Sequence, residues 1–330
     1  MKESFLRCTL FLLLAHSCTA QTSPKATAAQ VTPSPLPEVV RVDAQTQKGF
    51  LYPYYLYIPP ELQSEKGKSA KQNLLVLPNN TGKTDDSFAV HDRYARRNTE
   101  DLRRLASNLS VILLMPAFPR PNADWRIYTH ALDRDSLLTD RKEYKRFDQQ
   151  LIRMIDHARK NLRADGLRID KRVFMFGFSA SGMFTNRFTF LHPERVKAAA
   201  IGSPGGWAIA PIGAWKGKTL RYPIGSADLK IVSGRKLDLK RLRKVPLFLF
   251  LGAEDTNDSV IFRDSYELED EKLIFDLFGK TLVERWVTTQ TIYGANLLEA
   301  TLKLYPKVGH IISKEMWNDI KAFFSKHLHD

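Results

Sequence analysis

The sequence predicts a single α/β domain in which a mostly parallel sheet carries helices on both faces. Two observations lead to this prediction. Short apolar runs without polar alternation, such as residues 111–115 and 247–251, have the length of strands that are buried on both faces. Segments with helical spacing lie between such runs over about 290 residues, and this alternation favours a parallel sheet with covering helices.

Each expected element has a local reason. The aromatic residues of 49–60 favour a strand, and the pair Pro59 and Pro60 ends it. Residues 146–162 form an expected helix because apolar side chains recur there at helical spacing, at Phe147, Leu151, Met154, Ile155 and Ala158. The other expected strands are 73–77, 111–115, 172–176, 196–201 and 247–251, and the other expected helices are 102–108, 183–191 and 318–328.

The composition is that of an ordinary globular protein. The 330 residues are 43% apolar and 26% charged, which excludes a wholly disordered or collagen-like chain. Two cysteines are too few for a disulfide scaffold. The formal net charge is +14. Because no nucleic-acid-binding motif accompanies this charge, we expect no nucleic-acid partner; the alternatives are an acidic surface or substrate, or a basic surface without a partner.

The first 20 residues have the pattern of a secretory signal peptide. Lys2 and Arg7 precede an apolar run at 9–15, and small residues follow up to Ala20, after which we expect cleavage. A degraded lipoprotein-type site at Cys18 is the alternative, and acylation there would tether the protein to a membrane. In both cases we expect an exported protein, periplasmic or extracellular.

The remaining chain divides into a linker and a domain. Residues 21–38 are rich in Ser, Thr, Ala and Pro and predict a disordered linker, so the folded domain is expected at 39–330. Within it, residues 207–244 interrupt the alternation with a long stretch rich in glycine and basic residues. We expect an insertion here, either a lid that faces the substrate or a peripheral addition.

The strongest chemical signal is Gly-Phe-Ser-Ala-Ser-Gly at 177–182, between an expected strand and an expected helix. A serine on such a turn is a candidate nucleophile, and the residues two before and two after it must be small. Gly177 and Ser181 meet that demand. The turn presents the Ser179 hydroxyl and places the Ala180 N–H at the helix start, where it can bind a developing oxyanion.

A serine nucleophile needs a base and a group that orients it. Histidine suits the first task because its ordinary pKa is about 6.5. Of the eight histidines, His310 alone lies in a short turn between the last expected strand and the closing helix. For the orienting carboxylate we expect Asp255, which follows the buried strand 247–251, with Glu254 and Asp258 as neighbouring alternatives.

The chain order Ser179, Asp255, His310 resembles that of the α/β-hydrolase superfamily. More narrowly, residues 50–330 resemble secreted esterases related to polyhydroxyalkanoate depolymerases and feruloyl esterases. The motifs behind this resemblance are Ile-Asp-Lys-Arg-Val at 169–173, His-Pro-Glu-Arg-Val at 192–196 and Val-Gly-His at 308–310. The resemblance implies a single α/β-hydrolase domain that hydrolyses esters with a Ser-His-Asp triad and with neither a metal nor a cofactor.

The sequence departs from the family pattern after the strand at 74–77. Many members have His-Gly and further glycines there, which supply the second oxyanion N–H, whereas this chain has Pro-Asn-Asn-Thr-Gly at 78–82. We expect the Asn80 N–H to take that role, with the Asn79 N–H as the alternative. The expected substrate is a small-molecule or polymeric ester. A peptidase of the prolyl-oligopeptidase type and an inactive envelope binding protein with the same fold remain open.

Overall fold

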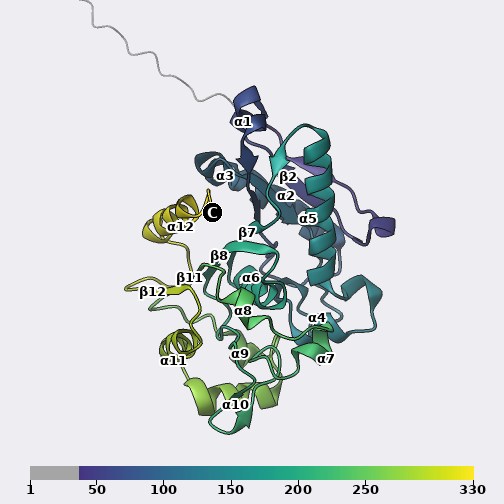
Figure 1. The fold of residues 1–330 in the computed structure, drawn as a ribbon. Helices are drawn as coiled ribbons and strands as arrows, with labels where there is room; N and C mark the ends of the chain where they lie inside the picture. The colour runs from purple at the N-terminus through teal and green to yellow at the C-terminus, as the bar shows by residue number, and fades with distance from the viewer. Residues whose placement is uncertain (1–36) are drawn as a thin grey trace, which may run out of the picture. The chain divides into compact units, whose positions relative to one another are not determined.

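An eight-stranded sheet with the strand order β1-β2-β5-β4-β7-β8-β11-β12 forms the centre of the fold (Figure 1). The computed structural model describes residues 37–330. The expected signal peptide, Cys18 and the linker up to residue 36 lie outside the described residues.

The strands that build this sheet are mostly the apolar runs of the sequence. Strand β2 is antiparallel to both of its neighbours, and every later pair in the sheet is parallel, so the expected mostly parallel sheet is confirmed. The strands are β1 (Val40–Val42), β2 (Tyr54–Tyr57), β4 (Leu74–Val76), β5 (Ile112–Pro116), β7 (Val173–Phe178), β8 (Val196–Gly202), β11 (Leu247–Gly252) and β12 (Ala300–Tyr305). Two short pairs lie outside it, β3 (Lys71–Gln72) with β6 (Arg168–Ile169) and β9 (Ala214–Trp215) with β10 (Lys218–Thr219).

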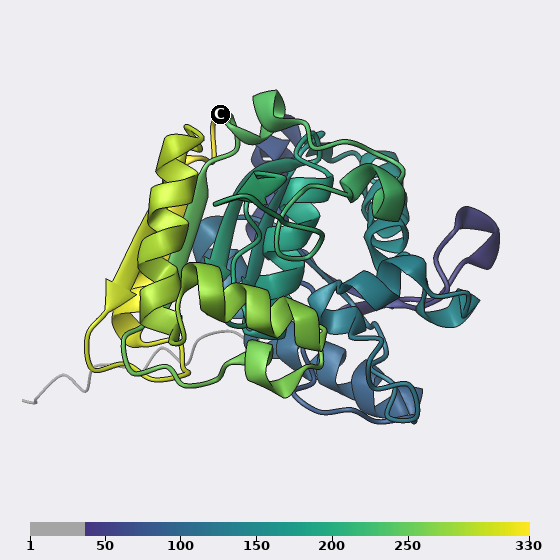
Figure 2. The ribbon, with the colours of Figure 1, turned by 90° about the horizontal axis from the view of Figure 1, so that it is seen from below.

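Helices lie on both sides of the sheet (Figures 1 and 2). The α-helices are α1 (Glu65–Ser69), α2 (Phe88–Asp101), α3 (Arg103–Leu109), α4 (Arg134–Leu138), α5 (Phe147–Ala164), α6 (Ala180–Leu191), α7 (Leu229–Ser233), α8 (Leu239–Leu242), α9 (Ser259–Phe262), α10 (Leu268–Phe278), α11 (Leu282–Ala295) and α12 (Lys314–Lys326). Short 3-10 helices are η1 (Thr46–Lys48), η2 (Pro60–Gln63), η3 (Thr129–Ala131) and η4 (Lys142–Tyr144). Among residues 37–330, no helix is long and apolar enough to cross a membrane.

The sheet is buried on both faces. Alternate residues of β4 show this, because Leu74 and Val76 belong to the core beneath α5, α6 and α11, whereas Leu75 belongs to the core beneath α2, α3 and α12. A strand that is apolar on both sides loses the alternating pattern of a half-exposed strand. The continuous apolar runs in the sequence follow from this burial.

Two expected helices begin earlier than the sequence suggested. Helix α6 starts at Ala180 rather than at Met183, so the candidate nucleophile directly precedes it. Helix α12 starts at Lys314 rather than at Asn318, because the Ser313 side chain caps it by accepting a hydrogen bond from the Met316 N–H. The other α-helices of residues 37–330, among them the long helices α2, α10 and α11, were not expected.

Residues 207–244, where an insertion was expected, pack in two different places in the structure. In the first part, Trp207, Leu220 and Ile224 pack in one apolar cluster with Ala180 and Met183, at the start of α6. The second part holds α7 and α8, whose buried side chains join the core of the main sheet. The first part therefore borders the candidate nucleophile, and the second part belongs to the body of the domain.

Candidate active site

Ser179 occupies a sharp turn between β7 and α6. Its backbone angles, φ 61° and ψ −127°, lie in a region that residues with a Cβ rarely adopt. Two glycines leave room for the turn. A Cβ on Gly177 would lie 2.0 Å from the Ser181 carbonyl oxygen, and one on Gly182 would lie 2.3 Å from the Gly202 carbonyl oxygen. The small residues of the motif are therefore required by close backbone packing.

Hydrogen bonds on either side fix this turn. The Ser179 N–H donates to the Gly202 carbonyl at 3.0 Å, which ties the turn to the neighbouring strand β8. The Ser181 hydroxyl donates to the Phe178 carbonyl at 2.9 Å and lies 3.0 Å from the Phe178 nitrogen. Ala180 is the first residue of α6, so its N–H has no partner within the helix and is free to donate to a ligand.

Asp255 and His310 are in contact at the carboxyl ends of β11 and β12. The Asp255 Oδ2 atom lies 2.9 Å from His310 Nδ1, and its Oδ1 atom accepts a hydrogen bond of 2.9 Å from the Asn257 N–H. Burial raises the pKa of Asp255, but these hydrogen bonds outweigh it and hold the pKa below its ordinary value. The ionised carboxylate therefore accepts from a protonated Nδ1.

The two alternative carboxylates do not contact His310. Glu254 is exposed to solvent, and Asp258 pairs with the buried guanidinium of Arg285. Two backbone hydrogen bonds join the turn that carries Asp255 to the loop that carries His310. The Ala253 N–H donates to the Tyr305 carbonyl at 2.8 Å, and the Glu254 N–H donates to the Val308 carbonyl at 2.9 Å.

The remaining nitrogen of His310 is also occupied. The side-chain amide nitrogen of Asn257 lies 2.9 Å from His310 Nε2. The imidazole packs against Phe178, the residue before Ser179, with ring centroids 4.8 Å apart. Within residues 37–330, no hydrogen bond joins Ser179 to His310. The structure thus brings the acid and the base together, and the residue before Ser179 contacts the base.

The loop after β4 carries the expected second oxyanion donor. Of residues 37–330, none accepts a hydrogen bond from the Asn79 or the Asn80 N–H. The Asn79 side chain is buried and bonds the backbone of Phe118 in both directions, at 2.9 and 3.0 Å. The Asn80 side chain accepts from the Gly82 N–H at 3.1 Å. Both asparagines therefore shape the loop through their side chains and leave their backbone donors free.

Two buried histidines brace this loop, and no local pattern in the sequence predicts them. His130 Nε2 lies 2.8 Å from the Phe118 carbonyl, and His91 Nδ1 lies 2.8 Å from the Thr81 hydroxyl. Burial lowers the pKa of His130 to about 3 and also lowers the pKa of His91. Both rings are therefore neutral at pH 7. His130 lies in η3 and His91 lies in α2.

The motif 192–196 has a structural role away from this site. His192 ends α6 and is buried, with Nε2 2.8 Å from the Asp148 carboxylate. Burial raises the pKa of Asp148, but hydrogen bonds from Arg146 and His192 outweigh it and hold that pKa well below its ordinary value. This network joins the end of α6 to the start of α5.

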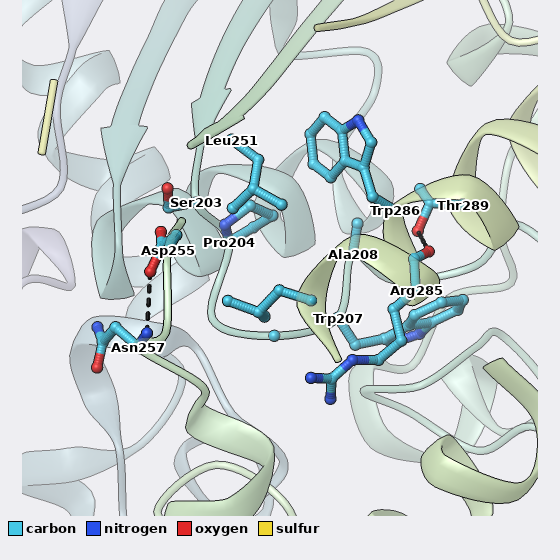
Figure 3. A pocket seen from close by; sticks show the side chains of 12 residues that line it. Ser203, Pro204, Trp207, Ala208, Leu251, Asp255, Asn257, Arg285, Trp286 and Thr289 are labelled. Carbon is cyan, nitrogen blue, oxygen red and sulfur yellow. Dashed lines mark hydrogen bonds between the residues drawn. The ribbon is translucent and has the colours of Figure 1, made fainter. Parts of the chain in front are cut away.

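A small pocket adjoins the acid (Figure 3). Asp255 and Asn257 lie on one side of it, and Arg285 and Trp286 of α11 lie on the other. Its free space of about 20 Å³ is room for a single water molecule. Neither Ser179 nor His310 lines it. Among residues 37–330, no group of three or more His, Cys, Asp or Glu side chains is arranged to hold a metal ion.

Comparisons with known proteins give structural matches only. No protein-family model and no curated protein sequence matches the chain. Poly(aspartic acid) hydrolase-1 from Sphingomonas sp. KT-1 superposes with a TM-score of 0.58 at 19% identity, over 89% of this chain and 100% of that one. S-formylglutathione hydrolase from Agrobacterium tumefaciens has a TM-score of 0.51 at 17% identity, over 88% of this chain and 94% of that one. A poly(3-hydroxybutyrate) depolymerase from Bordetella parapertussis has a TM-score of 0.50 at 16% identity, over 84% of this chain and 87% of that one. The likeness shows a shared fold.

Proposed function

This chain has the α/β-hydrolase fold, and from that premise we propose that it is a serine esterase that hydrolyses carboxylic esters. The nucleophile is Ser179, the base is His310 and the orienting acid is Asp255. The secretory pattern of residues 1–20 supports an exported enzyme.

The reaction proceeds through an acyl-enzyme. The Ser179 oxygen attacks the ester carbonyl while His310 Nε2 takes the hydroxyl proton. The backbone N–H groups of Ala180 and Asn80 stabilise the negative charge on the former carbonyl oxygen. His310 then gives the proton to the departing alkoxide. Water, activated by the same nitrogen, releases the acid and restores the serine.

The observation that carries this proposal is the backbone of Ser179. A non-glycine residue at φ 61° and ψ −127° is strained, and such strain persists only where the surroundings hold it. Here it holds a hydroxyl at the edge of the sheet, directly before a free helix N–H. A turn without a chemical task would be more stable with glycine at this position.

Hydrolysis of nitrophenyl esters, from acetate to palmitate, tests the proposal in the full chain. We expect the wild type to hydrolyse at least the short esters and Ser179→Ala to lose this activity. The chain-length profile reports the size of the acyl site. Full activity in Ser179→Ala would overturn the assignment.

The two alternatives predict different results. A prolyl-oligopeptidase-type peptidase would cleave proline-containing peptide substrates faster than esters and would still lose activity with Ser179→Ala. An inactive binding protein would hydrolyse no ester in either form while remaining folded by circular dichroism.

A further inference from the structure

Both ring nitrogens of His310 have partners, and their protonation states follow from these partners. The Asp255 carboxylate can only accept a hydrogen bond, so Nδ1 carries the ring proton of the neutral imidazole. Nε2 is then an acceptor. The Asn257 side chain 2.9 Å away offers its NH₂ group, which can only donate. The contact is therefore an N–H···N hydrogen bond from Asn257 to His310.

This bond uses the lone pair on which the proposed reaction depends. A neutral imidazole nitrogen has a single in-plane lone pair, and the base that takes a proton from Ser179 must use it. Asn257 and Ser179 therefore compete for His310 Nε2. The absence of a hydrogen bond between Ser179 and His310 within residues 37–330 agrees with Asn257 holding the nitrogen.

We propose that Asn257 is a positioning residue that latches His310 in the resting enzyme. Its amide keeps the imidazole in the tautomer whose Nε2 carries no proton, and it must leave Nε2 before Ser179 can donate its proton there. The catalytic consequence of this contact rests on the proposed function of the triad. The contact itself can be tested without any reaction.

The position of Asn257 allows a clean test. Its backbone N–H bonds Asp255, and its side chain bonds His310. A side-chain substitution therefore leaves the hydrogen bond to the acid intact. Figure 3 shows Asn257 at the edge of the small pocket, with its amide directed away from the residues on the opposite wall. The side chain is half-buried, so a change there leaves the core undisturbed.

The first measurement is the rate at which a fluorophosphonate labels Ser179 in the full chain. Loss of one competing neutral hydrogen bond corresponds to about a 2- to 10-fold change, so Asn257→Ala should label about 2- to 10-fold faster than the wild type. Asn257→Leu, which keeps the side-chain volume but cannot donate, should do the same. An unchanged or slower rate in both folded variants would overturn the latch.

Helix α5 offers a matched control. The amide nitrogen of Asn161 lies 3.4 Å from His157 Nε2, a pair of the same chemistry outside the site. Asn161→Ala should label at the wild-type rate. An equal acceleration in this variant would show that loosening the fold, rather than freeing His310, causes the effect.

Nitrogen-15 NMR of the full chain labelled in its histidines tests the contact independently of activity. We expect the His310 Nε2 resonance to move in Asn257→Ala and to stay in Asn161→Ala. If the wild type is never labelled but the resonance moves, the proposed function fails and the contact stands. If the resonance does not move, the latch is wrong whatever the labelling rates show.

Discussion

Replacing Ser179 by glycine should make the protein more stable while abolishing its proposed activity. The turn holds this residue at φ 61° and ψ −127°, which glycine adopts without a Cβ clash. The side chain is half-exposed, and its hydroxyl makes no hydrogen bond within residues 37–330. Its removal therefore takes away little packing and no bonded partner.

The size of the effect follows from two opposing terms. Release of a strained backbone conformation contributes about 1–3 kcal/mol. The greater freedom of glycine in the unfolded chain subtracts about 0.5–1 kcal/mol. The net expectation for Ser179→Gly is a gain of about 1 kcal/mol in the free energy of unfolding. Ser179→Ala keeps its Cβ and with it the strain, so its stability should lie within about 0.5 kcal/mol of the wild type.

Urea unfolding followed by tryptophan fluorescence and by circular dichroism measures all three proteins side by side. The free energy of unfolding should be higher for Ser179→Gly than for both Ser179→Ala and the wild type, and a thermal melt should show a melting temperature about 2–4 °C higher. Because both variants lack the hydroxyl, a difference between them reports the backbone alone. Equal stability of the glycine and alanine variants would refute the argument that the turn is strained.

Three further predictions concern the neighbours of this turn. Asp255→Asn should lower kcat for nitrophenyl acetate by about 10⁴-fold with the fold retained, because the amide favours the wrong imidazole tautomer; a loss below tenfold would contradict its role. Gly177→Ala should lower the free energy of unfolding by about 1–3 kcal/mol, since the added Cβ would lie 2.0 Å from the Ser181 carbonyl oxygen, and a melting curve like that of the wild type would refute the close packing. Burial lowers the pKa of His130 to about 3, whereas the pKa of a histidine in the unfolded chain is about 6.5. The free energy of unfolding therefore falls as the pH drops below about 6.5, and the loss from this group is about 2 kcal/mol at pH 5. Urea titrations of His130→Gln at several pH values should lack this part of the acid slope, and identical slopes would contradict it.

The sequence predicts the centre of the sheet well because burial on both faces leaves a strong local signal. The run Val-Phe-Met-Phe that begins β7 is apolar at every position and can only be a buried strand or helix segment. The edge strand β12 is different. Of its residues only Tyr305 is fully buried, and they include the charged Lys303, so composition alone does not mark it. Its place could be inferred only from the turn that follows.

Two of the helices that the sequence did not predict show why. Helix α11 contains two valines and three threonines that lower its helical propensity, although Thr281 and Glu284 at its start form a capping box that could have found it. Helix α2 is rich in charged residues and buries only a few side chains, among them Ala95, which packs against the sheet. Its helical character comes from tertiary packing rather than from a clear apolar stripe.

The candidate site is readable from the sequence in part. Ser179, Asp255 and His310 each follow a strand, and parallel strands end at one edge of a sheet, so their common location could be expected. The sequence does not predict the contact of Asn257 with His310 or the burial of His130. Both depend on side-chain directions set by loops that approach one another only in the folded chain, and neither residue type carries a local pattern.

The central claim is that Ser179 is the nucleophile, and the most direct measurement is the identification of the residue that a fluorophosphonate modifies. The full chain is treated with the reagent, its intact mass is measured, and the modified peptide is sequenced by mass spectrometry, with Ser179→Ala treated in parallel. We predict a single adduct per wild-type chain on Ser179 and no adduct on the variant. An unmodified, folded wild type, or an adduct on another residue, would contradict the claim.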